Sequence, residues 1–227
     1  MGFRILNLRH HNKLKVETNN ETVVLVHGLW MNGMDMSLIA RRIRQQGYQV
    51  VHFRYNSLTT SPRGNALLLQ ERTKQIETPV VHFICHSLGG LVIRHLFFLC
   101  PDQNPGRVVT LGTPHKPSYC AYQISRLLFG KILLGKSTED GLLGNVPKWK
   151  GSHDLGSIAG SLRLGLGMIV PGVPRPNDGT VSVEETRCDN MKDYTVLKVS
   201  HFGMLLSPSV TDFSLEFIQT GKFPLLQ

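Results

Sequence analysis

The sequence predicts an α/β fold in which a mostly parallel sheet of about six or seven strands is covered by helices on both faces. Two observations indicate this fold. The strand-like segments are continuous apolar runs, as expected for strands buried on both faces. Strand-like and helix-like segments also alternate along most of the chain. With 227 residues, 41% of them hydrophobic, the chain is long enough to bury one sizeable core, so we expect a single domain over residues 1–227.

The predicted strands are short and rich in Val, Ile, Leu and Phe, and lie at residues 22–26, 49–54, 80–85, 107–111, 155–159 and 194–199. Helical spacing or helix-start signals place helices at residues 35–46, 61–75, 88–99, 121–134 and 210–219. Ser61-Pro62, for example, suits an N-cap followed by the first helical position. Residues 3–8 are predicted to form an extra edge strand or an arm.

Residues 116–151 interrupt the alternation and predict a small helical cap inserted in the domain. An amphipathic helix over 121–134 is followed by a Gly-rich loop. We expect this helix either to cover the pocket as a lid or simply to pack on the sheet. Its apolar face and its basic residues Arg126 and Lys131 also suit a weak contact with the surface of a membrane.

Composition and charge exclude several classes of protein. The formal net charge is +9, but the basic residues are spread in short clusters without zinc-finger or RNA-binding signatures. We therefore interpret the charge as a solvated surface and expect no nucleic-acid partner. The four cysteines form no C-x-x-C pair, so neither a disulfide framework nor a metal site is expected. The basic N-terminal stretch has no long apolar segment, and no run is long enough to cross a membrane, which predicts a cytoplasmic protein.

The most informative stretch is residues 80–90, which read V-V-H-F-I-C-H-S-L-G-G. A strand breaks abruptly at Ser87 and continues as a helix, an arrangement that exposes a nucleophile. The stretch resembles the nucleophile elbow of the α/β-hydrolase lipases and esterases, with Cys85 where the family usually has its first glycine. Because cysteine is small but carries a Cβ, we expect the turn to be slightly relaxed, and Cys85 is the first residue to inspect for strain. His86 is expected to point away from the site.

Two further segments carry the same resemblance. Residues 23–28, V-V-L-V-H-G, resemble the strand and loop that build half of the family's oxyanion hole. Residues 111–115, L-G-T-P-H, resemble a loop that flanks the pocket in many lipases. The resemblance implies that the backbone N–H groups of Leu29 and Leu88 bind the oxyanion. Trp30 and Met31 follow the oxyanion loop and are expected to line an apolar pocket.

The resemblance also implies an acid and a base. Asp178, in N-D-G-T-V, resembles the family's acid loop, although a generic Asp-Gly turn is the alternative. The rival acids are Asp154, Glu184, Asp189 and Asp193. His201 directly follows the last predicted strand, where the family places its base. The order Ser87, Asp178, His201 is that of the α/β-hydrolases.

The implied activity is that of a serine hydrolase that cleaves carboxylic esters with an apolar acyl group through an acyl-enzyme. Its substrate would be a small-molecule or lipid acyl ester, and the chemistry needs no cofactor and no metal. An acyltransferase or thioesterase with the same triad is the alternative within this fold, and a non-catalytic ligand-binding protein is the alternative outside catalysis. The sequence leaves the oligomeric state open.

Overall fold

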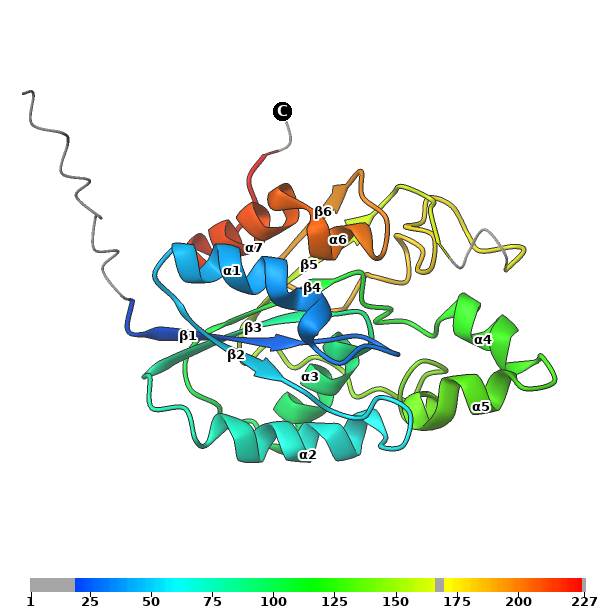
Figure 1. Ribbon diagram of the computed structural model, residues 1–227, viewed down its shortest axis with the longest axis horizontal. Helices are drawn as coiled ribbons and strands as arrows, with labels where there is room; N and C mark the ends of the chain where they lie inside the picture. Colours follow the sequence, from blue (N-terminus) through cyan, green and yellow to red (C-terminus); the bar gives the residue numbers. More distant parts are fainter. Residues whose placement is uncertain (1–18, 166–169, 226–227) are drawn as a thin grey trace, which may run out of the picture.

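The computed structural model describes residues 19–165 and 170–225 and shows a parallel sheet between two layers of helices (Figure 1). The segment at residues 3–8 lies outside the described residues. The strands run in the order β2-β1-β3-β4-β5-β6, and every neighbouring pair is parallel. Their bounds are β1 Glu21–Val26, β2 Gln49–Phe53, β3 Val80–His86, β4 Arg107–Leu111, β5 Asp154–Gly160 and β6 Asp193–Leu197. The predicted fold class is confirmed, and each strand lies within two residues of its predicted bounds.

Helices cover both faces of this sheet. One face carries α1 (Ser37–Gln45), which follows a short 3₁₀ turn at Met34–Met36, together with α6 (Gly203–Leu206) and α7 (Pro208–Thr220). The other face carries α2 (Pro62–Thr73) and α3 (Leu88–Leu99). Among the helices of residues 19–165 and 170–225, none has the length and apolarity needed to span a bilayer.

The core is divided by the sheet into two halves. Along β1, Val23 and Leu25 face the α1 and α7 side, whereas Val24 and Val26 face the α2 and α3 side. All four side chains are almost completely buried. Burial on both faces explains why the strands read as continuous apolar runs and not as alternating patterns.

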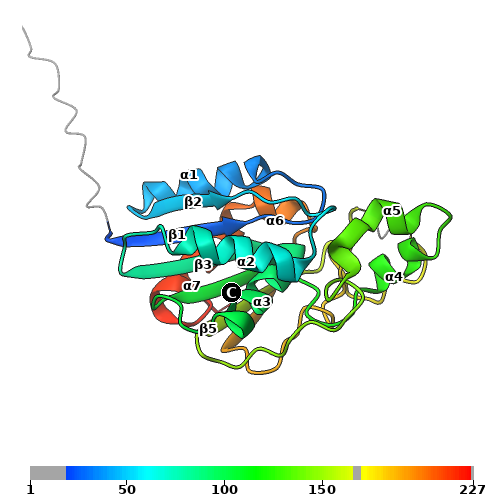
Figure 2. The same cartoon turned by 90° about the horizontal axis from the view of Figure 1, so that it is seen from below.

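The structure corrects the prediction of one helix over residues 121–134. Two short helices are present instead, α4 (Tyr119–Ser125) and α5 (Gly130–Leu134), and a 3₁₀ turn, η2 (Gly135–Thr138), follows them. At Gly130 the chain folds back so closely that a Cβ would collide with the carbonyl oxygen of Ile124. Amphipathic spacing alone does not reveal this turn, because it depends on the absence of one side chain. In Figures 1 and 2, α4 and α5 stand beyond the carboxyl ends of the strands.

Candidate active site

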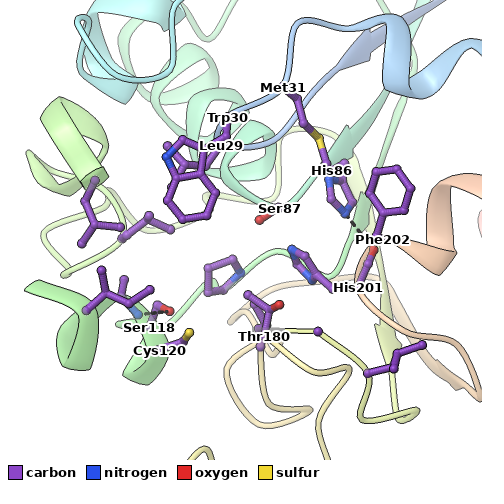
Figure 3. Close-up of a pocket in the computed structure, with 18 residues that line it drawn as sticks. Leu29, Trp30, Met31, His86, Ser87, Ser118, Cys120, Thr180, His201 and Phe202 are labelled. Atoms are coloured by element: carbon purple, nitrogen blue, oxygen red, sulfur yellow. Dashed lines mark hydrogen bonds between the residues drawn. The ribbon is translucent and has the colours of Figure 1, made fainter. Parts of the chain in front are cut away.

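Ser87 occupies a sharp turn between β3 and α3. Its backbone has φ 52° and ψ −120°, a conformation that costs free energy for any residue with a Cβ. Hydrogen bonds hold it in place. The Ser87 N–H donates to the carbonyl of Leu111 at 2.9 Å, and the Ser87 carbonyl accepts from the hydroxyl of Thr113 at 2.8 Å and from the N–H of Gly90 at 3.0 Å. The turn therefore lies at the carboxyl edge of the sheet, with its side chain in a pocket (Figure 3).

Cys85 itself is not strained. Cys85 belongs to the regular part of β3, paired with Val26 on one side and Thr110 on the other, and its side chain is fully buried. The strained residue is Ser87, two positions later. The backbones of α3 and β1 come closest at Gly89, where a Cβ would lie 2.5 Å from the carbonyl oxygen of Val26. Cysteine is tolerated at position 85 because the strand has not yet turned there.

His201 and Asp178 lie in direct contact. The Nδ1 atom of His201 is 2.6 Å from Oδ2 of Asp178, a carboxylate that is completely buried. The other carboxylate oxygen accepts the N–H groups of Thr180 at 2.9 Å and Val181 at 2.7 Å. Asp178 thus forms the turn that its sequence pattern indicated and also binds the histidine. With Nδ1–H given to the carboxylate, Nε2 of His201 is free to accept a proton.

The space for this contact comes from a glycine. A Cβ at Gly112, which has φ 57°, would lie 3.0 Å from both Oδ2 of Asp178 and Nδ1 of His201. Figure 3 shows the side chains of His201 and Ser87 turned toward one another in the pocket. Three residues that lie far apart in the sequence are therefore brought to one site.

His86 also belongs to this site, contrary to the expectation that it points away. Its ring centroid lies 4.7 Å from that of His201, and its Nε2 lies 3.1 Å from the His201 carbonyl oxygen, to which it donates. Burial, and secondly the nearby His201, lower the pKa of His86 well below 6.5, so the ring is neutral. His86 therefore braces His201. No sequence signal indicates this role, since it depends on how the loop after β6 packs against β3.

The backbone amides of Leu29 and Leu88 stand ready to donate. Among the described residues, neither N–H has a protein acceptor. Leu88 is the first residue of α3, where the amides of a helix have no partner within the helix. Leu29 lines the pocket, one residue after Gly28.

The side chain of His27 fixes the loop that carries the Leu29 amide. Its Nδ1–H donates to the carbonyl of Gly28 at 2.9 Å, and its Nε2 accepts the N–H of Tyr55 at 3.3 Å. The ring also stacks on that of Tyr55, with centroids 4.1 Å apart, and burial lowers the pKa of His27. The C=O and N–H of a trans peptide point in opposite directions, so holding the Gly28 carbonyl sets the direction of the Leu29 N–H.

The pocket is a cavity of about 220 Å³ with mainly apolar walls. Trp30 and Met31 line it, whereas Met34 does not. Residues of the segment between β4 and β5 form one wall: Ser118, Cys120, Ala121, Ile124, Leu134 and Leu142. The indole N–H of Trp30 donates to the carbonyl of Leu133 at 2.8 Å, which connects the loop after β1 to α5.

The rival acids have other partners or lie elsewhere. Asp154 begins β5, at the opposite end of the sheet, and pairs with Arg107 at 3.4 Å. Glu184 is exposed and pairs with Lys116. Asp193 accepts the N–H of Phe223 at 2.7 Å. Among the residues described, no group of three or more His, Cys, Asp or Glu side chains is arranged to hold a metal ion.

The sheet and the arrangement around Ser87 correspond to the α/β-hydrolase fold. Residues 17–116 match the family model described as "Putative serine esterase (DUF676)". This matched part contains Ser87 and β1 with the loop that follows it. No match was found among curated protein sequences.

Solved structures of lipases and esterases share the fold. The mature form of the Bacillus licheniformis lipase BlEst2 superposes with a TM-score of 0.67 and 18% identity, covering 84% of this chain and 87% of that one. The lipase-esterase related protein from Clostridium acetobutylicum superposes with a TM-score of 0.63 and 12% identity, covering 89% of this chain and 97% of that one. The metagenomic carboxyl esterase MGS0156 superposes with a TM-score of 0.64 and 15% identity, covering 82% of this chain and 66% of that one. At such identities the likeness concerns the fold.

Proposed function

We propose that this protein is a serine hydrolase that cleaves carboxylic esters with an apolar acyl group. One observation carries the proposal: Ser87 stands on a positive-φ turn in the same cavity as His201, whose Nδ1 lies 2.6 Å from the buried carboxylate of Asp178. The match of residues 17–116 to a serine esterase family supports the same conclusion.

In the proposed reaction, Oγ of Ser87 attacks the acyl carbonyl while Nε2 of His201 takes its proton. Asp178 keeps His201 in the required tautomer and stabilises the imidazolium. The N–H groups of Leu29 and Leu88 bind the tetrahedral oxyanion, helped by the positive end of the α3 dipole. His201 then protonates the leaving alcohol, and the acyl group remains on Ser87. A water molecule deprotonated by His201 releases the acid and restores the hydroxyl.

The cavity indicates the size and polarity of the acyl group. Its volume of about 220 Å³ has room for an acyl chain of several carbons. The wall contributed by Ala121, Ile124 and Leu134 is apolar, so a charged acyl group would lose its hydration without compensation. In this proposal the insertion at residues 116–151 acts as the cover of the acyl site.

A fluorophosphonate probe, which reacts with activated serines, tests the proposal. The wild-type protein is expected to be labelled and the Ser87→Ala variant is not. A series of p-nitrophenyl esters of increasing chain length then measures turnover, with and without an added alcohol or thiol acceptor. The absence of both labelling and turnover would contradict the proposal and favour a ligand-binding role. Product formed mainly on the added acceptor would favour acyl transfer.

A further inference from the structure

The segment from α4 to α5 exposes an unusual set of large apolar side chains. We call residues 119–134 the apolar tip. Six of its side chains are between 51% and 89% exposed, namely Tyr122, Leu127, Leu128, Phe129, Ile132 and Leu133. Leu128 and Ile132 are the most exposed, at 89% and 74%. A soluble monomer rarely leaves so many neighbouring apolar groups in water unless they bind something.

The charges around the apolar tip have one sign. Residues 116–138 contain four basic residues and no acidic one, and acidic residues resume only at Glu139. Lys116 is paired with Glu184. The other three, Arg126, Lys131 and Lys136, are exposed, and no ion pair between described residues involves them. The surface therefore combines apolar side chains with unneutralised cations.

The apolar tip lies beside the entrance of the candidate active site. Both views of the fold show α4 and α5 projecting beyond the carboxyl ends of the strands (Figures 1 and 2). Trp30, Leu164 and Phe202 line the cavity and are each about half exposed, so the apolar surface continues to its mouth. The hydrogen bond from Trp30 to Leu133 joins the two parts.

We propose that the apolar tip binds the surface of an anionic lipid bilayer. The exposed side chains of Leu128, Phe129 and Ile132 enter the boundary between head groups and acyl chains, and the three cations contact lipid phosphates. Unneutralised cations beside exposed apolar side chains are complementary to an anionic membrane, whose negative surface potential attracts basic residues. Binding in this orientation brings the mouth of the cavity to the lipid, so that, if the proposed function holds, an acyl ester passes into the cavity from the membrane.

Co-sedimentation of the full chain with vesicles tests the proposal. Vesicles of phosphatidylcholine mixed with phosphatidylglycerol are expected to bind the protein, and vesicles of phosphatidylcholine alone to bind it much more weakly. Neutralising Lys131 and Lys136 together with glutamine should weaken binding about twentyfold to thirtyfold, since each cation near the surface contributes about fivefold. Replacing Leu128 and Ile132 together with serine should weaken binding more than tenfold.

The matched control is the pair Leu67→Ser and Leu68→Ser on α2, whose side chains are 50% and 54% exposed away from the tip. This control is expected to bind vesicles like the wild type, and the melting temperature of each variant reports its folding. Ser87→Ala should also bind like the wild type, which separates binding from hydrolysis.

Failure to bind anionic vesicles would overturn the proposal. So would equal loss of binding in the tip variants and in the α2 control. If the wild type does not bind vesicles but is a dimer that Leu128→Ser converts to a monomer, the apolar tip is an interface between copies of this chain, and the proposal is likewise overturned.

Discussion

The imidazole of His27 donates a hydrogen bond from Nδ1 to the carbonyl oxygen of Gly28, 2.9 Å away. The same peptide unit carries the N–H of Leu29. His27 thus acts on the proposed oxyanion hole through the backbone, although it touches no reacting atom. Its neutral state follows from burial, which lowers its pKa, and its tautomer follows from the Tyr55 N–H that Nε2 accepts.

His27→Phe should therefore lower kcat while leaving KM almost unchanged. The phenyl ring keeps the stacking on Tyr55 but loses the bond to Gly28. We expect a loss of about tenfold, smaller than the roughly 10²- to 10³-fold cost of removing an oxyanion donor outright. A boronic acid inhibitor, which mimics the tetrahedral intermediate, should lose affinity in parallel with kcat/KM. His52→Phe is the control, because His52 makes the same kind of bond to Gly33, at 3.0 Å, outside the cavity. Equal kcat values for the two variants would contradict this role.

Asp178→Asn should lower kcat by about 10⁴, because the amide no longer fixes the tautomer of His201 or stabilises its charged form. Steady-state kinetics with a soluble ester measures the loss. Asp154→Asn is the matched control at the other end of the sheet and should keep kcat within about twofold, as expected for a residue that contacts no reacting group. A wild-type rate for Asp178→Asn would mean that another carboxylate serves as the acid.

Ala121→Leu should shift the preference of the enzyme toward shorter esters. Ala121 lines the cavity from α4, and the larger side chain fills part of the space for the distal acyl carbons. We expect turnover of an octanoyl ester to fall at least about tenfold relative to an acetyl ester, since one methylene in an apolar pocket changes discrimination by about 10- to 200-fold. Kcat/KM ratios for the two esters provide the measurement. An unchanged ratio would place the acyl chain elsewhere.

Acid should destabilise the fold below about pH 6.5, and His115 should account for part of the effect. Burial, and secondly the nearby Arg94, lower the pKa of His115 from 6.5 to about 3. Between these values the unfolded chain binds the proton and the native protein does not, so the free energy of unfolding falls with falling pH, by about 1.4 kcal/mol per unit for this group. Urea unfolding between pH 7 and pH 4 should show a shallower slope in His115→Gln. Parallel slopes would contradict the assignment.

Cys85→Gly introduces the glycine that is usual in the nucleophile elbow, and we expect it to reduce stability without improving activity. Cys85 is fully buried in a regular strand, so glycine removes packing and adds flexibility to the unfolded chain. The free energy of unfolding should fall by about 1–2 kcal/mol, with kcat unchanged. A rise in kcat would show that the cysteine strains the turn after all.

Much of the fold was readable from the sequence because its determinants are local. Burial on both faces makes each strand a continuous apolar run, and Ser61-Pro62 marks the start of α2, where the Ser61 hydroxyl accepts the N–H of Gly64 at 3.2 Å. The break between α4 and α5 could not be predicted from the sequence, because it depends on the close contact of Gly130 with the carbonyl group of Ile124. A helical period is a property of one segment, whereas a chain reversal depends on the contacts that the segment makes in the folded protein.

The sequence by itself determined the chain order of Ser87, Asp178 and His201, and the positions of Ser87 and His201 shortly after strands. Only the tertiary structure decided their contacts. It placed His201 2.6 Å from Asp178 and put the strain on Ser87 and not on Cys85. It also placed His86 and His27 within hydrogen-bond distance of the carbonyl groups of His201 and Gly28. The physical reason is that hydropathy and turn patterns act over a few residues, while these contacts join loops from strands whose neighbours are fixed only when the sheet assembles.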